Sequence, residues 1–154
     1  MIPDWDTYFM DIAEAVSRRS KDPNTKVGCV IVNSTNRQIS QGYNSFPSGS
    51  NDNVEARFQR PEKYLWIEHA ERNAIYSAAR HGIALDGSRI YLMGLPCMDC
   101  ARAIVQAGIV EIIYDYDRQV KWKTPQYEPI FGKSQQLLHE CGVKIRAWMR
   151  PCVG

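Results

Sequence analysis

The stretch RIYLMGLPCMDCARAIVQAGIVEIIY, residues 89–114, decides the fold because it predicts a strand, a helix and a second strand in succession. Residues 89–93 and 109–114 are short runs of mainly apolar, β-branched and aromatic side chains, which are typical of buried strands. Residues 97–106 between them carry apolar side chains at helical spacing. A strand–helix–strand unit predicts two parallel strands joined by a right-handed crossover.

The region upstream of this unit predicts an amphipathic helix followed by a hairpin. Apolar side chains recur at helical spacing over residues 4–19, and a segment with Pro and Asn then breaks the pattern. Residues 27–32, VGCVIV, form a nearly continuous β-branched run. A polar turn separates them from residues 38–44, QISQGYN, which we expect to pair with them as an antiparallel strand.

Further helices and strands alternate along the rest of the chain. Residues 70–80 predict a helix that ends near Gly82, and residues 131–142 predict a helix that ends at Gly142. Residues 143–149 predict the last strand. We therefore expect an α/β fold in three layers, α/β/α, around a five-stranded mixed sheet in which parallel strands follow the antiparallel hairpin. Because no linker or repeat interrupts the pattern, residues 1–154 are expected to form one domain.

Composition limits the classes of partner. Nineteen Lys and Arg against seventeen Asp and Glu leave a net charge of +2, which argues against a nucleic-acid partner and against a membrane surface. The chain has no apolar run long enough to span a bilayer, and its first residues do not resemble a secretory signal. Five irregularly spaced cysteines favour a reducing compartment, so we expect a cytoplasmic protein, or one of the host cytoplasm if it is viral.

Cys97 and Cys100 form a Cys-x-x-Cys pair that by itself fits redox exchange, a structural zinc site or a catalytic metal site. A closed zinc ribbon would need a second such pair, which the sequence lacks. His69 and Glu71 lie upstream, two positions apart at the start of another expected helix. His-x-Glu followed by Pro-Cys-x-x-Cys is the signature of zinc-dependent base deaminases.

Chemistry explains this set of residues. One imidazole, from His69, and two thiolates, from Cys97 and Cys100, leave the fourth position of a tetrahedral zinc ion open for water, as in catalytic sites. Helix N-termini stabilise thiolates, and two cysteines three positions apart lie on one helix face. Glu71 is placed to take a proton from that water and to deliver it to the substrate. The alternatives are a redox pair and an acid that simply faces solvent.

The segments SKDPNTKVG (20–28), GYNSFPSG (42–49), HAERNAI (69–75) and PCMDCARAIVQAGI (96–109) resemble the deoxycytidylate (dCMP) deaminase family, which has the cytidine deaminase-like fold. The resemblance covers about residues 5–148. It implies hydrolysis of dCMP to dUMP and ammonia, which supplies the precursor of thymidylate. The zinc motif also occurs in tRNA adenosine, guanine and riboflavin-pathway deaminases, so the motif alone indicates the reaction and not the substrate.

The resemblance implies roles at the metal and at the pyrimidine. One catalytic zinc ion per chain is expected on His69, Cys97 and Cys100, with Glu71 as the proton carrier. The backbone of Ala70 is expected at the amide edge of the pyrimidine, and Asn44 at the sugar or base.

The resemblance also implies residues for anionic groups. Ser20 and Lys21 are candidates for the substrate phosphate, with Lys26 or Arg19 as alternatives, although a solvated helix end would explain the same residues. Arg80 is a candidate for an allosteric nucleotide, although an arginine at a helix end needs no ligand. Ser45 replaces the glycine usual in the family, which could alter the loop that holds the effector or the sugar.

Partners and regulation follow from the same resemblance: dCTP as an activator, dTTP as an inhibitor, and a homo-oligomer that is a hexamer or smaller. Two other functions stay open. The same zinc chemistry could act on another base, nucleoside or nucleotide, including dCTP or tRNA adenosine, although the low net charge disfavours RNA. A zinc-stabilised module without turnover is the third reading, and Glu71 argues against it because a structural site has no use for the acid.

Overall fold

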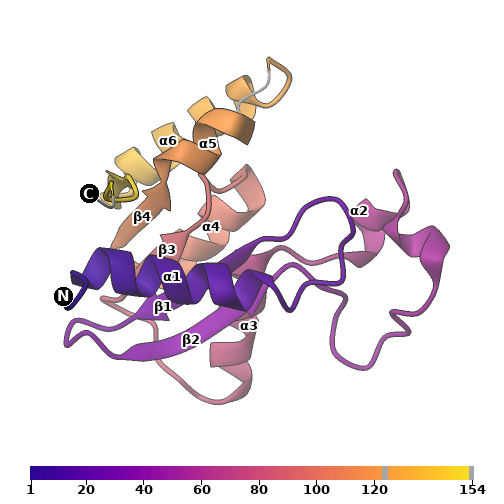
Figure 1. Cartoon of the computed structure of the whole chain (residues 1–154), viewed down its shortest axis with the longest axis horizontal. Coiled ribbons are helices and arrows are strands. Elements are labelled where there is room, and N and C mark those ends of the chain that lie inside the picture. Colours follow the sequence, from indigo (N-terminus) through magenta and orange to yellow (C-terminus); the bar gives the residue numbers. More distant parts are fainter. Residues whose placement is uncertain (123–124, 153–154) are drawn as a thin grey trace.

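The computed structural model describes residues 1–122 and 125–152 and contains a five-stranded mixed sheet (Figure 1). The strand order is β2-β1-β3-β4-β5. β1 is antiparallel to both β2 and β3, and β3, β4 and β5 are parallel to one another. The expected hairpin followed by parallel strands is confirmed. The strands are β1 (Gly28–Val32), β2 (Gln38–Tyr43), β3 (Arg89–Leu92), β4 (Glu111–Asp115) and β5 (Lys144–Trp148).

Helices cover both faces of this sheet, as expected. α1 packs on one face, while α3, α4 and α6 pack on the other and enclose the larger of the two apolar cores. α5 lies on the α1 side, where Arg118 pairs with Glu14 of α1 at 3.4 Å. The helices are α1 (Trp5–Ser17), η1 (Glu55–Phe58), α2 (Lys63–Trp66), α3 (Ala70–Arg80), α4 (Met98–Gln106), α5 (Tyr116–Trp122) and α6 (Glu128–Glu140). Among the described residues, no helix is long and apolar enough to cross a membrane.

The position of α3 depends on small residues on both sides of its contact with the sheet. Ala70, Ala74 and Ala78 of α3 are fully or almost fully buried. Opposite them, a Cβ atom on Gly42 of β2 would lie only 2.2 Å from the carbonyl oxygen of Ala70. The helix backbone can therefore rest directly on the strand only because position 42 has no side chain. This close contact determines where the first turn of α3 lies.

Three segments differ from the sequence-based expectation. η1 and α2 lie between β2 and α3, where the sequence analysis predicts no helix or strand. This segment is ordered by a Phe46–Phe58 ring pair with centroids 4.9 Å apart and by Arg57 over the ring of Trp66 at 3.7 Å. α5 was not expected, because a seven-residue helix with Gln119 as its buried residue has little apolar periodicity. α6 begins at Glu128, three residues earlier than predicted.

Candidate active site

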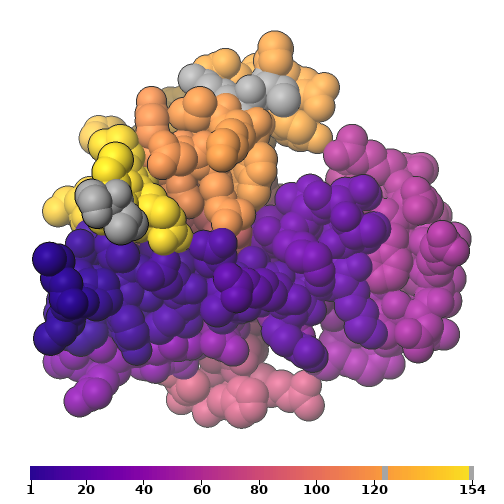
Figure 2. Space-filling model, viewed as in Figure 1, coloured from indigo at the N-terminus to yellow at the C-terminus, as the bar shows by residue number. Residues whose placement is uncertain are grey.

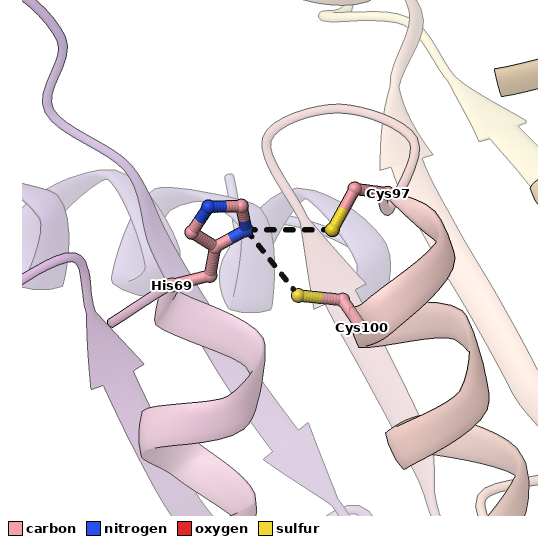
Figure 3. A group of neighbouring side chains, drawn as sticks. All are labelled: His69, Cys97 and Cys100. Carbon is pink, nitrogen blue, oxygen red and sulfur yellow. Dashed lines mark hydrogen bonds between the residues drawn. The ribbon is translucent and has the colours of Figure 1, made fainter. Parts of the chain in front are cut away.

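Two helix N-termini bring a histidine and two cysteines together (Figure 3). His69 is the N-cap of α3 and Cys97 is the N-cap of α4, while Cys100 lies in the first turn of α4. The Nδ1 atom of His69 lies 3.5 Å from Sγ of Cys97 and 3.5 Å from Sγ of Cys100. Their three potential ligand atoms all lie within 4.8 Å of one another.

This spacing fits a tetrahedral zinc ion. With Zn–N of about 2.05 Å, Zn–S of about 2.3 Å and a tetrahedral angle, the nitrogen and each sulfur would be about 3.6 Å apart. The distances of 3.5 Å between His69 Nδ1 and the two sulfurs agree with that value. The three protein ligands leave the fourth tetrahedral position open. The residues present therefore suit a catalytic rather than a closed structural zinc site.

The two thiols are not electrostatically equivalent. A hydrogen bond from the Cys100 thiol, supported by one from His69, lowers the pKa of Cys97 to about 4. The same contact with Cys97, together with burial, raises the pKa of Cys100, and the hydrogen bond to Cys97 raises the pKa of His69. The cluster therefore already stabilises one thiolate, which is the form of cysteine that binds a metal.

Glu71 is a buried carboxyl group two residues after the histidine. Its exposed fraction is 8%, and none of the ion pairs found among the described residues involves it. Burial is the main cause that raises the pKa of Glu71, with His69 acting in the opposite direction. A raised pKa makes this carboxylate a better proton acceptor than an exposed glutamate, as a general base must be.

A cavity of about 680 Å³ contains this site. His69, Glu71 and Cys97 line it together with the backbone region of Ala70 and with the loop that follows β3. Residues of the segment 60–67 line one side, and the other side is lined by Lys121, Trp122, Tyr127, Ile130 and Phe131. Figure 2 shows the surface hollowed between the magenta and the orange parts of the chain. Among the described residues, the cationic side chains of its lining are Arg60, Lys63, Arg72 and Lys121.

The structure brings some of the predicted substrate residues to the cavity but uses them differently. Ala70 and Asn44 both line it. The amide of Asn44 is engaged with backbone: Oδ1 accepts the N–H of Val27 at 2.8 Å and Nδ2 donates to the carbonyl of Thr25 at 2.8 Å. Ser20 is buried, and its hydroxyl donates to the carbonyl of Asn44 at 2.8 Å. Asn44 and Ser20 therefore hold the 20–27 segment in place.

The predicted phosphate residues do not line this cavity. Lys21 is exposed, pairs with Asp52 at 2.8 Å and lines a second cavity of about 290 Å³, beside Ser45 and Arg19. The ammonium of Lys26 donates to the carbonyl of Ser20. The ammonium groups of Lys21 and Lys26 are thus held by acceptors on Asp52 and Ser20, which do not line the cavity of Glu71.

The candidate for an allosteric nucleotide lies apart from both cavities. Arg80 is exposed at the C-terminal end of α3, the opposite end of the helix from His69, and it lines neither cavity.

Sequence reasoning missed the cations that do surround the cavity. Lys63 forms an ion pair with the buried carboxylate of Asp22 at 2.8 Å, which joins α2 to the segment after α1. Arg72 pairs with Glu68 and lies 3.4 Å from Asp99, a residue between the two cysteines of α4. Arg72 directly follows Glu71 in the sequence, so its position next to the predicted proton carrier could have identified it as a residue of the cavity. No such signal marked Lys63 or Lys121. Each lies in a helix that the sequence analysis does not predict, and there a lysine cannot be distinguished from any solvated lysine.

Comparison with known proteins agrees with this geometry. Residues 3–116 match the family model described as the cytidine and deoxycytidylate deaminase zinc-binding region. A crystal structure of dCMP deaminase from the cyanophage S-TIM5 in complex with dCMP and dUMP superposes with a TM-score of 0.74 at 26% identity, over 96% of this chain and 99% of that one.

Relatives from animals and bacteria are also similar in sequence. A probable deoxycytidylate deaminase of Drosophila melanogaster is 36% identical over 92% of this chain and 71% of its own length. Deoxycytidylate deaminase of Homo sapiens is 40% identical over 75% of this chain and 66% of its own length. An uncharacterized deaminase of Aliivibrio fischeri is 42% identical over 97% of this chain and 96% of its own length.

Proposed function

The chain belongs to the cytidine and deoxycytidylate deaminase family, and from this premise we propose that it hydrolyses dCMP to dUMP and ammonia. The observation that carries the proposal is that His69, Cys97 and Glu71 line one cavity with cationic walls, with Cys100 beside His69 as the third potential metal ligand. The names of its relatives and the dCMP-bound cyanophage structure support the substrate. Residues 1–154 would form one catalytic domain, and its free cysteines suit a reducing cytoplasm.

The proposed cofactor is one zinc ion per chain, held by His69, Cys97 and Cys100. When bound, zinc supplies Lewis-acid activation of a water molecule whose pKa falls from about 15.7 toward 7. Glu71 is not a ligand in this scheme. Its carboxylate would accept one proton of the attacking water and donate it to the pyrimidine ring nitrogen N3. It would then accept the second proton, from the newly added hydroxyl, and donate it to the amino group, which departs as ammonia while the carbonyl forms. The buried position of Glu71 keeps bulk water from competing for that proton.

The cations of the cavity support a nucleotide rather than a nucleoside substrate. A nucleotide with its pyrimidine at Glu71 would extend toward the open part of the cavity. Arg60, Lys63 and Lys121 contribute to the two walls there. Lys63 already pairs with Asp22, whereas no ion pair of Arg60 or Lys121 is found among the described residues. A doubly charged phosphate would compensate Arg60 and Lys121, and a nucleoside would leave them without a counter-ion. We propose Arg60 and Lys121 as phosphate candidates ahead of Lys21 and Lys26, because they line the cavity of Glu71 and Lys21 and Lys26 do not.

The test is a comparison of kcat/KM for ammonia release from dCMP, deoxycytidine, CMP, cytidine, dCTP and guanine, together with zinc analysis of the purified protein. We expect dCMP to exceed deoxycytidine by orders of magnitude. The double variant Arg60→Met/Lys121→Met should lose most of that preference, and Lys21→Met is the matched control that should keep it. Equal values for dCMP and deoxycytidine in the wild type would contradict the dCMP assignment, and active protein without zinc would contradict the zinc assignment.

Regulation by dCTP and dTTP and assembly into a homo-oligomer, a hexamer or smaller, remain part of this proposal. The second cavity, with Ser45 and Lys21 in its lining, is separate from Glu71 but shares the walls Asp22, Asn44 and Ile67 with the first. An effector bound there would contact residues that also shape the substrate cavity. Rates measured with and without dCTP and dTTP, on the wild type and on Ser45→Gly, test the effector, and sedimentation tests the assembly.

A further inference from the structure

One turn of α5 contacts the loop that leads to the first cysteine of the site. The side chain of Gln119 is buried, with 6% of the residue exposed. Its Oε1 atom accepts the backbone N–H of Leu95 at 2.7 Å. Leu95 lies two residues before Cys97, and it lines the same cavity as Glu71. Gln119, which is not part of the metal cluster, thus accepts a hydrogen bond from a backbone N–H two residues before Cys97.

Gly94, the neighbouring residue of the loop, leaves room for side chains of the same helix. A Cβ atom on Gly94 would lie 2.8 Å from the ring of Trp122 and 3.0 Å from Oε1 of Gln119. The absence of a side chain at position 94 therefore lets the α5 ring rest on the loop backbone. Gly94 and Leu95 are thus held by two residues of α5, Trp122 and Gln119.

The loop is also anchored on its other side. Met93 is buried, and its sulfur accepts the backbone N–H of Gly28 at 3.1 Å. The loop runs from this anchor at Met93 to Cys97, the N-cap of α4. Over that stretch, the polar contact found among the described residues is the hydrogen bond from the N–H of Leu95 to Gln119. Without Gln119 this half-buried N–H would lose its acceptor, so the loop would move to expose it to water.

We propose that Gln119 is a positioning residue for the active site: through Leu95 it holds the loop that places the Cys97 sulfur opposite His69. This inference rests on the proposed zinc-dependent function. It concerns a part of the chain that the family model does not describe, because the match ends at residue 116 and α5 continues to Trp122. The placement of the first cysteine ligand would then depend on a helix that lies almost wholly outside the matched region.

The test uses three variants of α5 in the full-length protein. Gln119→Met keeps the size and helix propensity of the side chain but removes the acceptor. Gln119→Glu keeps an oxygen that can accept the Leu95 N–H. Arg118→Gln is the matched control, because it removes the ion pair between α5 and Glu14 without touching the loop.

The first readout is the zinc dissociation constant measured by competition with a chromophoric chelator. The second is the absorption spectrum of the cobalt-substituted protein, which reports thiolate coordination directly. Loss of an outer-shell partner lowers metal affinity by about 10–100-fold, and we expect about tenfold for Gln119→Met because the contact acts through the backbone. Its cobalt spectrum should also change. Gln119→Glu should recover most of the affinity, and Arg118→Gln should match the wild type in both measurements.

Two results would overturn the inference: zinc affinity and cobalt spectrum of Gln119→Met equal to the wild type, or equal losses in Gln119→Met and Arg118→Gln. If Gln119→Met does not fold, Gln119→Asn serves instead, because its shorter side chain withdraws the acceptor and keeps the amide. Failure here is separable from failure of the proposed function. A wild type that binds zinc and deaminates dCMP while Gln119→Met remains normal refutes only the role of Gln119.

Discussion

Two clusters of ionisable side chains in this molecule serve different ends. The catalytic cluster consists of His69, Glu71, Cys97 and Cys100. The anchor cluster consists of Asp6 of α1, Tyr91 of β3, Glu111 of β4 and Arg146 of β5. In the anchor cluster Arg146 donates to Asp6 at 2.7 Å and to Glu111 at 2.9 Å, and the Tyr91 hydroxyl donates to Asp6 at 2.8 Å.

The difference lies in whether the charges are compensated. The hydrogen bond from Arg146 keeps the pKa of Asp6 below its ordinary value, so the charged acid is the favoured form there. Burial raises the pKa of Glu71, and no cation pairs with it among the described residues. An acid whose charge is balanced by a neighbouring cation stabilises the fold, because the folded state favours its charged form. An uncompensated buried acid costs stability and is available for proton transfer.

The largest effect is expected from Glu71→Gln. The amide has the shape of the acid but cannot carry the proton, so activity should fall by about 10²–10⁴-fold. That loss corresponds to about 3–5 kcal/mol in the activation barrier. Zinc content and thermal stability should be retained, since the variant removes an unpaired buried acid and no ligand. Steady-state ammonia release and metal analysis check this, and turnover near the wild-type rate would show that Glu71 is not the proton carrier.

Arg146→Met should have the opposite profile. It removes the cation that joins Asp6 to Glu111, which leaves Asp6 with the Tyr91 hydroxyl and Glu111 with Lys144 at 3.7 Å. Because the Arg146 side chain is 38% exposed, water replaces part of the lost interaction, and we expect a loss of about 1–2 kcal/mol in the free energy of unfolding. The kcat of the folded protein should stay unchanged. Urea unfolding and kinetics below the transition measure the two quantities, and loss of activity without loss of stability would contradict the division between the clusters.

The pH dependence of stability separates the two acids further. The folded-state pKa of Asp6 lies below its ordinary value of 3.8, so its contribution to stability is complete above that pH. The contribution disappears as the pH falls through the lower, folded-state pKa. The stability difference between the wild type and Asp6→Asn should therefore be constant near neutral pH and shrink below about pH 4. Acid unfolding of the two proteins tests this, and a difference that grows toward low pH would refute it.

Tyr91 extends the same test to high pH. Burial is the largest cause that raises the pKa of Tyr91 to about 12, above its ordinary value of 10. Its contribution to stability is present below pH 10 and is lost as the pH rises toward 12. Tyr91→Phe lacks this titration, so its stability should decline less than that of the wild type over that interval. Base titration monitored by circular dichroism makes the comparison, and equal declines would contradict it.

The smallest effect is expected from Lys21→Ala, which belongs to neither cluster. Its ion pair with Asp52 is exposed, and such pairs contribute about 0–1 kcal/mol. Because Lys21 does not line the cavity of Glu71, KM for dCMP should remain near the wild-type value. A large increase in KM would return Lys21 to the substrate site as the sequence first indicated.

Sequence analysis predicted the five strands and the long helices because these depend on local patterns. Apolar periodicity, Asp4 as a cap and glycines at helix ends lie within a few residues of the elements that they define. α5 escaped prediction for the converse reason. Its stability comes from Gln119 and Trp122, which contact a loop about 25 residues earlier in the chain, so no local signal announces it.

The sequence by itself determined the chemistry of the site. His69, Glu71, Cys97 and Cys100 lie in two short motifs, and the ligand atoms and proton carrier are properties of these side chains. Only the tertiary structure decided which other residues meet them. It engaged Asn44 with the backbone, took Lys21 to a second cavity and brought Lys63 and Lys121 to the first. The physical reason is that side-chain chemistry is local in the chain, while burial and charge compensation depend on which groups become neighbours in space.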